Sequence, residues 1–169
     1  MKYTYKKKVI SLSELLKNIS NNRNGRTIVF TNGCFDIIHS GHISYLRESR
    51  QLGDLLVVGL NSDKSVKLLK GANRPINRQE DRAMVLEAMD FVDYIVIFDE
   101  DTPFNIITLL KPDVYTKAGD YSLENMIGPG LGVEVITNYG GTVKLMPFIR
   151  GYSSTNVINR IKGGNNDVL

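Results

Sequence analysis

The sequence predicts an α/β protein, a doubly wound parallel sheet of about five strands with helices on both faces. Short runs of β-branched and aromatic residues, typical of buried parallel strands, alternate with segments whose apolar residues recur at helical spacing. This alternation requires crossover connections, which are right-handed and place helices on both faces of the sheet. With 169 residues, 42% of them hydrophobic and 23% charged, the chain has the length and balance of one globular domain.

The predicted domain occupies residues 26–162, between a leader at 1–25 and a frayed tail at 163–169. In the leader, Ser11 or Ser13 can cap a short amphipathic helix, which we expect to pack on the outside of the domain. The tail begins at a glycine that ends the last helix.

The strands are predicted from β-branched and aromatic composition between turn signals. They are expected at residues 27–31, 54–61, 94–98, 113–116 and 142–146.

Helices are predicted between the strands. One starts near Ser40 and one stops at Lys70, and an irregular segment separates the latter from a helix over 82–89. Further on, Thr102 is expected to cap a helix whose first residue is Pro103. The last helix is expected to start near Ser153 and to bury Val157, Ile158 and Ile161.

The first strand and the helix after it carry the strongest functional signal. Asn32-Gly33 is predicted to break the strand, because glycine permits a sharp turn and close approach of a ligand. The helix that follows presents free N–H groups and the positive end of its dipole, which together favour phosphate. His39 and His42 are three residues apart, so both neutral imidazoles are expected to point toward an anion held there.

This arrangement resembles the HxGH signature of the nucleotidyltransferase superfamily. The residues that carry the resemblance are Asn32-Gly33-Cys34-Phe35-Asp36 and His39-Ser-Gly41-His42, with strand, turn, histidines and helix in the expected order. The alternative is that the two histidines only cap and pack a helix start.

Composition excludes several other classes. The single cysteine, Cys34, excludes an intrachain disulfide and is interpreted as a small turn residue rather than a nucleophile or metal ligand. Net charge is only +3, and no basic stripe interleaved with aromatic residues indicates nucleic-acid binding. The basic start and the apolar residues after it are too short and too charged for a signal peptide or membrane span, so we expect a cytoplasmic protein without a membrane partner.

Ligands of open α/β sheets bind at the carboxyl ends of the strands, and polar residues follow four of the five predicted strands. Besides the histidine segment, they form three groups: Asn61 to Asp63, then Lys117 with Asp120 and Tyr121, and finally Gly151 to Thr155. In the first group, the alternative role of Ser62 or Asp63 is to cap a helix. The last group adds hydroxyls and N–H groups at a second helix start, a second candidate phosphate site.

Further stretches resemble the adenylyltransferase domain of ADP-heptose synthases, within the cytidylyltransferase-like branch of the superfamily. The similarity runs over residues 9–162, so the chain is expected to be the stand-alone form. The stretches are Lys70-Gly-x-x-Arg74-Pro-Ile-Asn77, Glu80-Asp-Arg82, Val92-Asp-Tyr94, Asp101-Thr-Pro103, Lys117-x-Gly-Asp-Tyr121 and Tyr139-Gly-Gly141. The pattern departs from the family at Ala118, usually glycine, at Ser154, usually threonine, and at residues 126–132.

The resemblance implies a Rossmann-like fold and transfer of adenylate from ATP, with Mg²⁺, to a sugar 1-phosphate, D-glycero-β-D-manno-heptose 1-phosphate. It also implies a homodimer and a helix near Val133, where propensity alone favours a strand. His39 and His42 are expected to hold the α- and β-phosphates, with Lys70 and Lys117 as further catalytic cations unless they are ordinary surface lysines. No residue is predicted to bind a metal. The expected nucleotide-binding residues are Asn32, Gly33, Cys34, Phe35, Asp36, Gly41, Asn61, Asp63, Asp120, Tyr121, Tyr152, Ser153, Ser154 and Thr155.

Two alternatives stay open on the sequence. One is a cytidylyltransferase for glycerol 3-phosphate or a related alcohol phosphate. The other is a nucleotide-binding module without catalysis.

Overall fold

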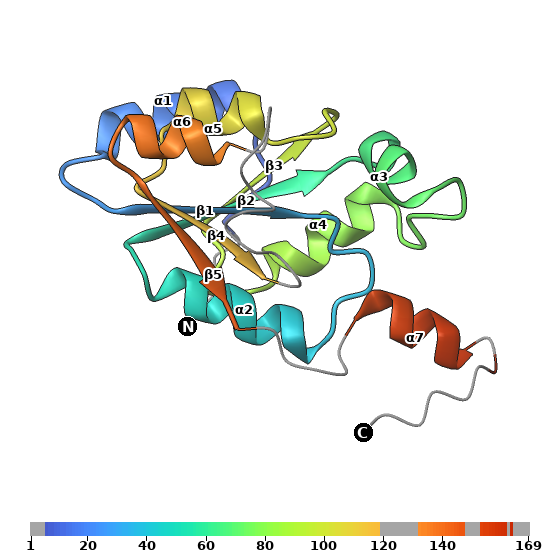
Figure 1. The fold of residues 1–169 in the computed structure, drawn as a ribbon. Coiled ribbons are helices and arrows are strands. Elements are labelled where there is room, and N and C mark those ends of the chain that lie inside the picture. Colours follow the sequence, from blue (N-terminus) through green and yellow to red (C-terminus); the bar gives the residue numbers. More distant parts are fainter. Residues whose placement is uncertain (1–5, 119–131, 148–152, 162, 164–169) are drawn as a thin grey trace.

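The computed structural model describes residues 6–118, 132–147, 153–161 and 163. Within them, five parallel strands form one sheet in the order β3-β2-β1-β4-β5, so the predicted Rossmann-like α/β fold is confirmed (Figure 1). The strands are β1 (Ile28–Gly33), β2 (Leu55–Asn61), β3 (Tyr94–Phe98), β4 (Val114–Ala118) and β5 (Thr142–Met146).

Helices cover both faces of this sheet: α1, α5 and α6 lie on one face, and α2 and α4 on the other (Figure 1). No helix in the described part of the chain is both long and apolar enough to cross a membrane. The helices are α1 (Leu12–Asn22), α2 (Ser40–Arg50), α3 (Asp63–Lys70), α4 (Gln79–Glu87), α5 (Phe104–Leu110), α6 (Val133–Asn138) and α7 (Ser154–Ile161).

Alternation along the strands divides the core into two layers. In β1, Ile28 and Phe30 pack toward α1 and α5, whereas Val29 packs toward α2 and α4. Successive side chains of a strand point to opposite faces, so one apolar run supplies both layers. All three side chains are fully buried.

The predicted leader contributes to the fold directly. Ser11, not Ser13, is the N-cap of α1, and it forms a capping box with Glu14. Leu15 and Ile19 of this helix are buried in the core. Just before α1, the N–H of Ile10 donates to the carbonyl of Ile95, and the N–H of Ile95 donates to the carbonyl of Lys8, so this segment pairs with the outer edge of β3.

Two element boundaries differ from the sequence prediction. β1 continues through Asn32 and Gly33, because both residues stay paired with β2, so the predicted break there is wrong. Pro103 is the N-cap of α5 and not its first residue, because its carbonyl accepts the first helical bond, from the Ile107 N–H at 3.0 Å. Neither cap position of α5 carries a side-chain cap bond, so Thr102 does not have its predicted role.

The C-terminal part corrects one prediction and confirms another. α7 buries none of its residues, with Val157 and Ile158 half-buried and Ile161 78% exposed, because the helix lies beside the two helix layers and not on the sheet (Figure 1). The segment at Val133 is a helix, as the family resemblance implied and against its strand propensity. Packing on the sheet decides this segment, because Val133 and Ile136 join the core beside α5.

A buried polar network fixes α2 against the sheet. The Tyr45 hydroxyl hydrogen-bonds the Thr31 hydroxyl of β1 and donates to the Thr116 carbonyl of β4 at 2.9 Å. One turn further along α2, the Ser49 and Thr116 hydroxyls are 2.9 Å apart. The network therefore sets where the start of α2, with its histidines, stands over the carboxyl ends of β1 and β4.

Tyr45→Phe should lower the free energy of unfolding by about 1–3 kcal/mol, because the buried Thr116 carbonyl loses this donor and the buried Thr31 hydroxyl loses its partner. Urea denaturation measures the change. Tyr94→Phe is the matched control, since the Tyr94 hydroxyl has no hydrogen bond to the described residues, and it should change stability by about 0.5 kcal/mol or less. Equal losses in the two variants would mean that the network does not hold α2.

Candidate active site

A cavity of about 480 Å³ opens at the carboxyl ends of the strands and brings together most of the predicted site. It lies between the start of α2, the end of α3 and the start of α7, as expected for an open α/β sheet. The predicted residues that line it are Asn32, Gly33, Cys34, Phe35, Asp36, His39, Gly41, His42, Asn61, Lys70, Lys117, Ser153, Ser154 and Thr155.

Four predicted residues are not among these. Asp120, Tyr121 and Tyr152 lie outside the described residues. Asp63 does not line the cavity formed by the described residues, and its carboxylate pairs with the Arg82 guanidinium at 2.8 Å. At this helix start Ser62 is the cap, accepting from the N–H of Ser65, which decides between the two candidate caps.

The chain turns at Phe35, two residues later than predicted. Phe35 has a left-handed backbone, with φ of 45°, and its ring packs 3.1 Å from the position that a Cβ on Gly33 would occupy. A side chain at Gly33 would therefore have to displace this ring. The glycine is needed for close packing at the turn rather than for an unusual backbone angle.

The two histidines stack on each other at the start of α2. His39 is the N-cap residue, but its side chain makes no capping bond, so the interpretation of the pair as helix caps is not supported. The ring centroids lie 3.8 Å apart with the planes 25° from parallel, and Phe35 packs on His42 at 5.3 Å.

Both imidazoles are neutral near pH 7. Partial burial lowers the pKa of His39, and burial together with the charge of His39 lowers the pKa of His42 to about 4. Buried Nδ1 of His42 has no hydrogen-bond partner among the described residues. A neutral imidazole has one N–H to donate, so the pair can bind a phosphate oxygen without bringing two adjacent positive charges together.

Positive charge enters the cavity from two other elements. Lys70 is the last residue of α3 and is exposed, whereas Lys117 on β4 donates to the Asn32 carbonyl at 3.3 Å. Burial lowers the pKa of Lys117 to about 8, so this amine still carries its proton at pH 7. The hydroxyl of Tyr115 donates to the Asn32 side-chain carbonyl, which leaves the amide N–H₂ of Asn32 as a donor.

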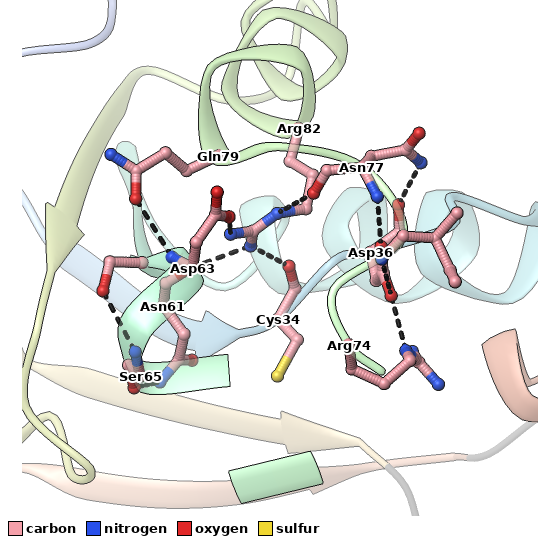
Figure 2. A network of polar contacts seen from close by, with 11 residues as sticks. Cys34, Asp36, Asn61, Asp63, Ser65, Arg74, Asn77, Gln79 and Arg82 are labelled. Atoms are coloured by element: carbon pink, nitrogen blue, oxygen red, sulfur yellow. Dashed lines mark hydrogen bonds and ion pairs between the residues drawn. The ribbon is translucent and has the colours of Figure 1, made fainter. Parts of the chain in front are cut away.

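Arg82 ties the site loops together, and the sequence reasoning did not select it. Its side chain is 1% exposed, and Figure 2 shows it among the segments that follow β1 and β2. Its guanidinium pairs with Asp63 and donates to the carbonyls of Cys34, Asn61 and Asn77. The available signal was its position four residues before Leu86 on the buried face of α4, where a charged residue needs partners.

Asp36 holds the segment between α3 and α4. Its carboxylate accepts from the N–H groups of Ile76 and Asn77 and from Nε of Arg74 at 2.6 Å (Figure 2). Burial opposes ionisation, but these donors hold the pKa of Asp36 below its ordinary value. The carboxylate that was predicted to bind nucleotide is thus used within the protein, while the residue still lines the cavity.

The start of α7 closes one side of the cavity. The N–H of Asn156 donates to the Ser153 hydroxyl, which acts as a cap, and the Ser154 hydroxyl donates to the Ile37 carbonyl at 3.1 Å. The second bond joins α7 to the turn that precedes the histidines. The predicted serine cap is therefore present at this helix start, and phosphate binding there stays a prediction.

The described residues include no group of three or more histidine, cysteine, aspartate or glutamate side chains placed to hold a metal ion. Two acidic residues line the cavity formed by the described residues. The Asp36 carboxylate already accepts hydrogen bonds from the protein, and the neighbours of Asp101 in the cavity wall are Thr102 and Pro103, which carry no carboxylate. The donor set therefore does not fit a metal held by protein ligands alone.

A parallel α/β sheet with two stacked histidines at a helix start, facing a basic cavity, defines a nucleotidyltransferase. A family model described as cytidylyltransferase-like matches residues 30–160, and the chain belongs to this family.

Relatives agree with this assignment. The chain is 54% identical over 159 residues to "Bifunctional protein HldE" of Campylobacter fetus subsp. fetus. The aligned residues cover 94% of this chain and 32% of that protein. A protein of the same name from Geobacter sulfurreducens is 53% identical over 137 residues, or 81% of this chain and 27% of its own length. The chain thus spans about a third of the length of these curated relatives.

Solved structures share the fold. The crystal structure of the lipopolysaccharide core biosynthesis protein from Thermoplasma volcanium superposes with a TM-score of 0.59 at 30% identity, covering 76% of this chain and all of the other. Pantoate-beta-alanine ligase from Francisella tularensis superposes with a TM-score of 0.61 at 12% identity, over 93% of this chain and 77% of the ligase. The second likeness concerns the fold alone.

The histidines should not titrate at their usual pH. We expect the imidazole NMR signals of His42 to shift with a midpoint near pH 4 instead of 6.5, and stability to fall as pH falls from 6.5 toward 4. Over that interval the unfolded chain takes up a proton and the folded ring does not. The chain has two histidines, so a His42→Asn variant assigns the signals. A midpoint near 6.5 would contradict the buried, neutral pair.

Cys34→Ser should keep the fold and at least half of the catalytic activity. Burial raises the pKa of the Cys34 thiol, against the opposing effect of nearby cations led by Lys70, so it carries no thiolate at pH 7. Pyrophosphate release by purified C34S measures the activity. A folded but inactive variant would show that the sulfur takes part in the reaction.

Proposed function

We propose that this protein is an adenylyltransferase that joins ATP and a sugar 1-phosphate, D-glycero-β-D-manno-heptose 1-phosphate, giving ADP-sugar and pyrophosphate. The observation that carries the proposal is the neutral His39–His42 stack at the start of α2, inside a cavity that Lys70 and Lys117 also line. Relatives named as HldE and as a lipopolysaccharide core biosynthesis protein support the choice of sugar phosphate over other acceptors.

The reaction needs charge control more than proton transfer. An oxygen of the sugar phosphate attacks the α-phosphorus of ATP, a new P–O bond forms, and the bond to the β-phosphate oxygen breaks to release pyrophosphate. The attacking oxygen is already ionised at neutral pH, so no general base is required. Catalysis then consists of bringing two anions together and stabilising the charge that develops as a third leaves.

Each element of the cavity has a place in this scheme. His39 and His42 donate to oxygens of the α- and β-phosphates, with the N–H groups of α2 adding a fixed dipole. Lys70, exposed at the end of α3, can swing over the triphosphate, while the more rigid Lys117 binds phosphate from β4. The start of α7 supplies further donors at Ser153 to Thr155.

Mg²⁺ is part of the proposal as a companion of ATP. It reduces the charge of the triphosphate and is held mainly by phosphate oxygens and water. The residues of the chain act on the phosphates directly.

The cell compartment and the oligomeric state follow from the proposed activity and its family. We place the enzyme in the cytoplasm, where ATP is available, and as a homodimer. Light scattering of the purified protein tests the second of these, and a monomer at micromolar concentration would contradict it.

Cytidylyl transfer is the second candidate, because the family description names that reaction. A screen separates the candidates: wild-type protein is incubated with ATP or CTP and with the heptose 1-phosphate, another sugar 1-phosphate or glycerol 3-phosphate, and pyrophosphate is measured. Release with ATP and the heptose phosphate is expected. Release with CTP and glycerol 3-phosphate would favour the second candidate, and absence of release in every combination would favour a binding module.

His42→Ala should lower kcat by at least about a hundredfold and leave the fold intact, since it removes a donor to the transition state. Steady-state pyrophosphate release gives kcat, and circular dichroism verifies the fold. Ser44→Ala on the same helix is the control and should retain normal turnover, because among the described residues the Ser44 hydroxyl donates to Glu48 alone. Near-normal turnover in H42A would remove the histidine from the mechanism.

A further inference from the structure

Arg74 stands out because the described residues use only a small part of its hydrogen-bonding capacity. It lines the cavity, and its side chain is only 16% exposed. Nε donates to Asp36 at 2.6 Å, and the two terminal nitrogens donate no hydrogen bond to the described residues. An arginine presents five N–H donors in a rigid fork, so four are not used by the described residues and can serve a ligand in the cavity.

Arg82 shows what a purely structural arginine looks like in the same fold. All three of its nitrogens donate to the protein, to three carbonyls and a carboxylate, and the side chain is 1% exposed. Figure 2 shows both arginines: Arg82 is surrounded by its acceptors, whereas the far end of the Arg74 guanidinium points away from Asp36. Arg74 is therefore fixed at one end and open at the other.

Asp36 does not need the whole charge of Arg74. Its oxygens also accept from the N–H groups of Ile76 and Asn77, so the carboxylate is stabilised by three donors. Two of them belong to the backbone of the same segment that carries Arg74. Asp36 thus holds the segment in place and orients the arginine, and it leaves the terminal nitrogens available to the cavity.

The surroundings of Arg74 favour an anion. The positive charges that act on the Cys34 thiol in the cavity wall include those of Lys70 and Arg74. The histidine pair and the start of α7 line the same cavity, and both are suited to phosphate. A planar guanidinium matches two oxygens of a phosphate at once, which a lysine cannot do.

We infer that Arg74 is a phosphate-binding residue of the active site, oriented by Asp36, and that it takes a phosphate of ATP or of the acceptor sugar phosphate. The inference rests on the proposed function for the identity of the acceptor. It adds a cation beyond Lys70 and Lys117, and it assigns Asp36 the role of a positioning residue.

Equilibrium binding tests the inference without turnover. Affinities of wild-type protein and of Arg74→Gln are measured for ATP, for adenosine and for D-glycero-β-D-manno-heptose 1-phosphate, each alone. R74Q should lose about tenfold or more in affinity for ATP or for the sugar phosphate, and none for adenosine. Loss with ATP identifies the triphosphate as the partner of Arg74, and loss with the sugar phosphate identifies the acceptor.

Arg78→Gln is the matched control. Arg78 is exposed on the same segment and does not line the cavity formed by the described residues, so R78Q removes the same charge and should bind all three ligands normally. Arg74→Lys is the second variant if R74Q melts at a lower temperature: it retains a charge but cannot hold Asp36 and face the cavity together, and an intermediate affinity is expected.

Two results would overturn the inference. One is wild-type affinity of R74Q for both phosphate ligands, and the other is a parallel loss for adenosine and ATP, which marks a structural role. If wild-type protein binds no sugar phosphate, the ATP measurement alone decides. The proposed function is tested by a separate measurement: if wild-type protein forms no ADP-sugar when incubated with ATP and the sugar phosphate, the proposed function fails.

Discussion

A guanidinium that is removed from water must be surrounded by acceptors, and the site is assembled around that constraint. Arg82 comes from α4, whereas its acceptors come from the turn after β1, from the end of β2 with the first residue of α3, and from the segment before α4. Loops rarely keep one geometry by themselves, but these three share one cation. The turn that leads to the histidines therefore has a fixed position relative to α3 and its terminal lysine.

The arrangement of charges in the cavity follows from the same need to pair buried charges. Two of the carboxylates near the site, Asp36 and Asp63, each have an arginine partner, and Asp101 is a further acidic residue at the cavity. The histidines remain neutral, and Lys117 still carries its proton at pH 7. Closely spaced cations repel each other in the empty site, and this repulsion destabilises the folded protein. Neutral imidazole donors beside well-separated cations avoid most of that cost and can still bind the anionic substrates proposed above.

The sequence predicted the part of the structure that short-range patterns determine. The five strands and their parallel arrangement follow from apolar runs, and the histidine pair follows from strand, turn and helix in order. Arg82, Tyr45 and Arg74 were not selected as site residues because their roles depend on partners distant in the chain. The contacts of Tyr45 at Thr31 and Thr116, for example, are 14 and 71 residues away. Asp63 illustrates the converse: its position after β2 was read correctly, but only the fold reveals that Arg82 occupies its carboxylate.

The short stretch of chain before α1 has a protective consequence. β3 ends the sheet, and an open outer strand is a template on which other molecules can stack into aggregates. Lys8 to Ile10 cover this edge strand through backbone hydrogen bonds with Ile95. The backbone N–H of Lys8 also donates to the Glu87 carboxylate, and its amine donates to the Met89 carbonyl. These residues precede the region that the family model matches, which begins at residue 30. Removing Lys8 to Ile10 alone would thus expose the backbone groups of this outer strand, while the core helix α1 and the residues that line the cavity would all remain in the chain.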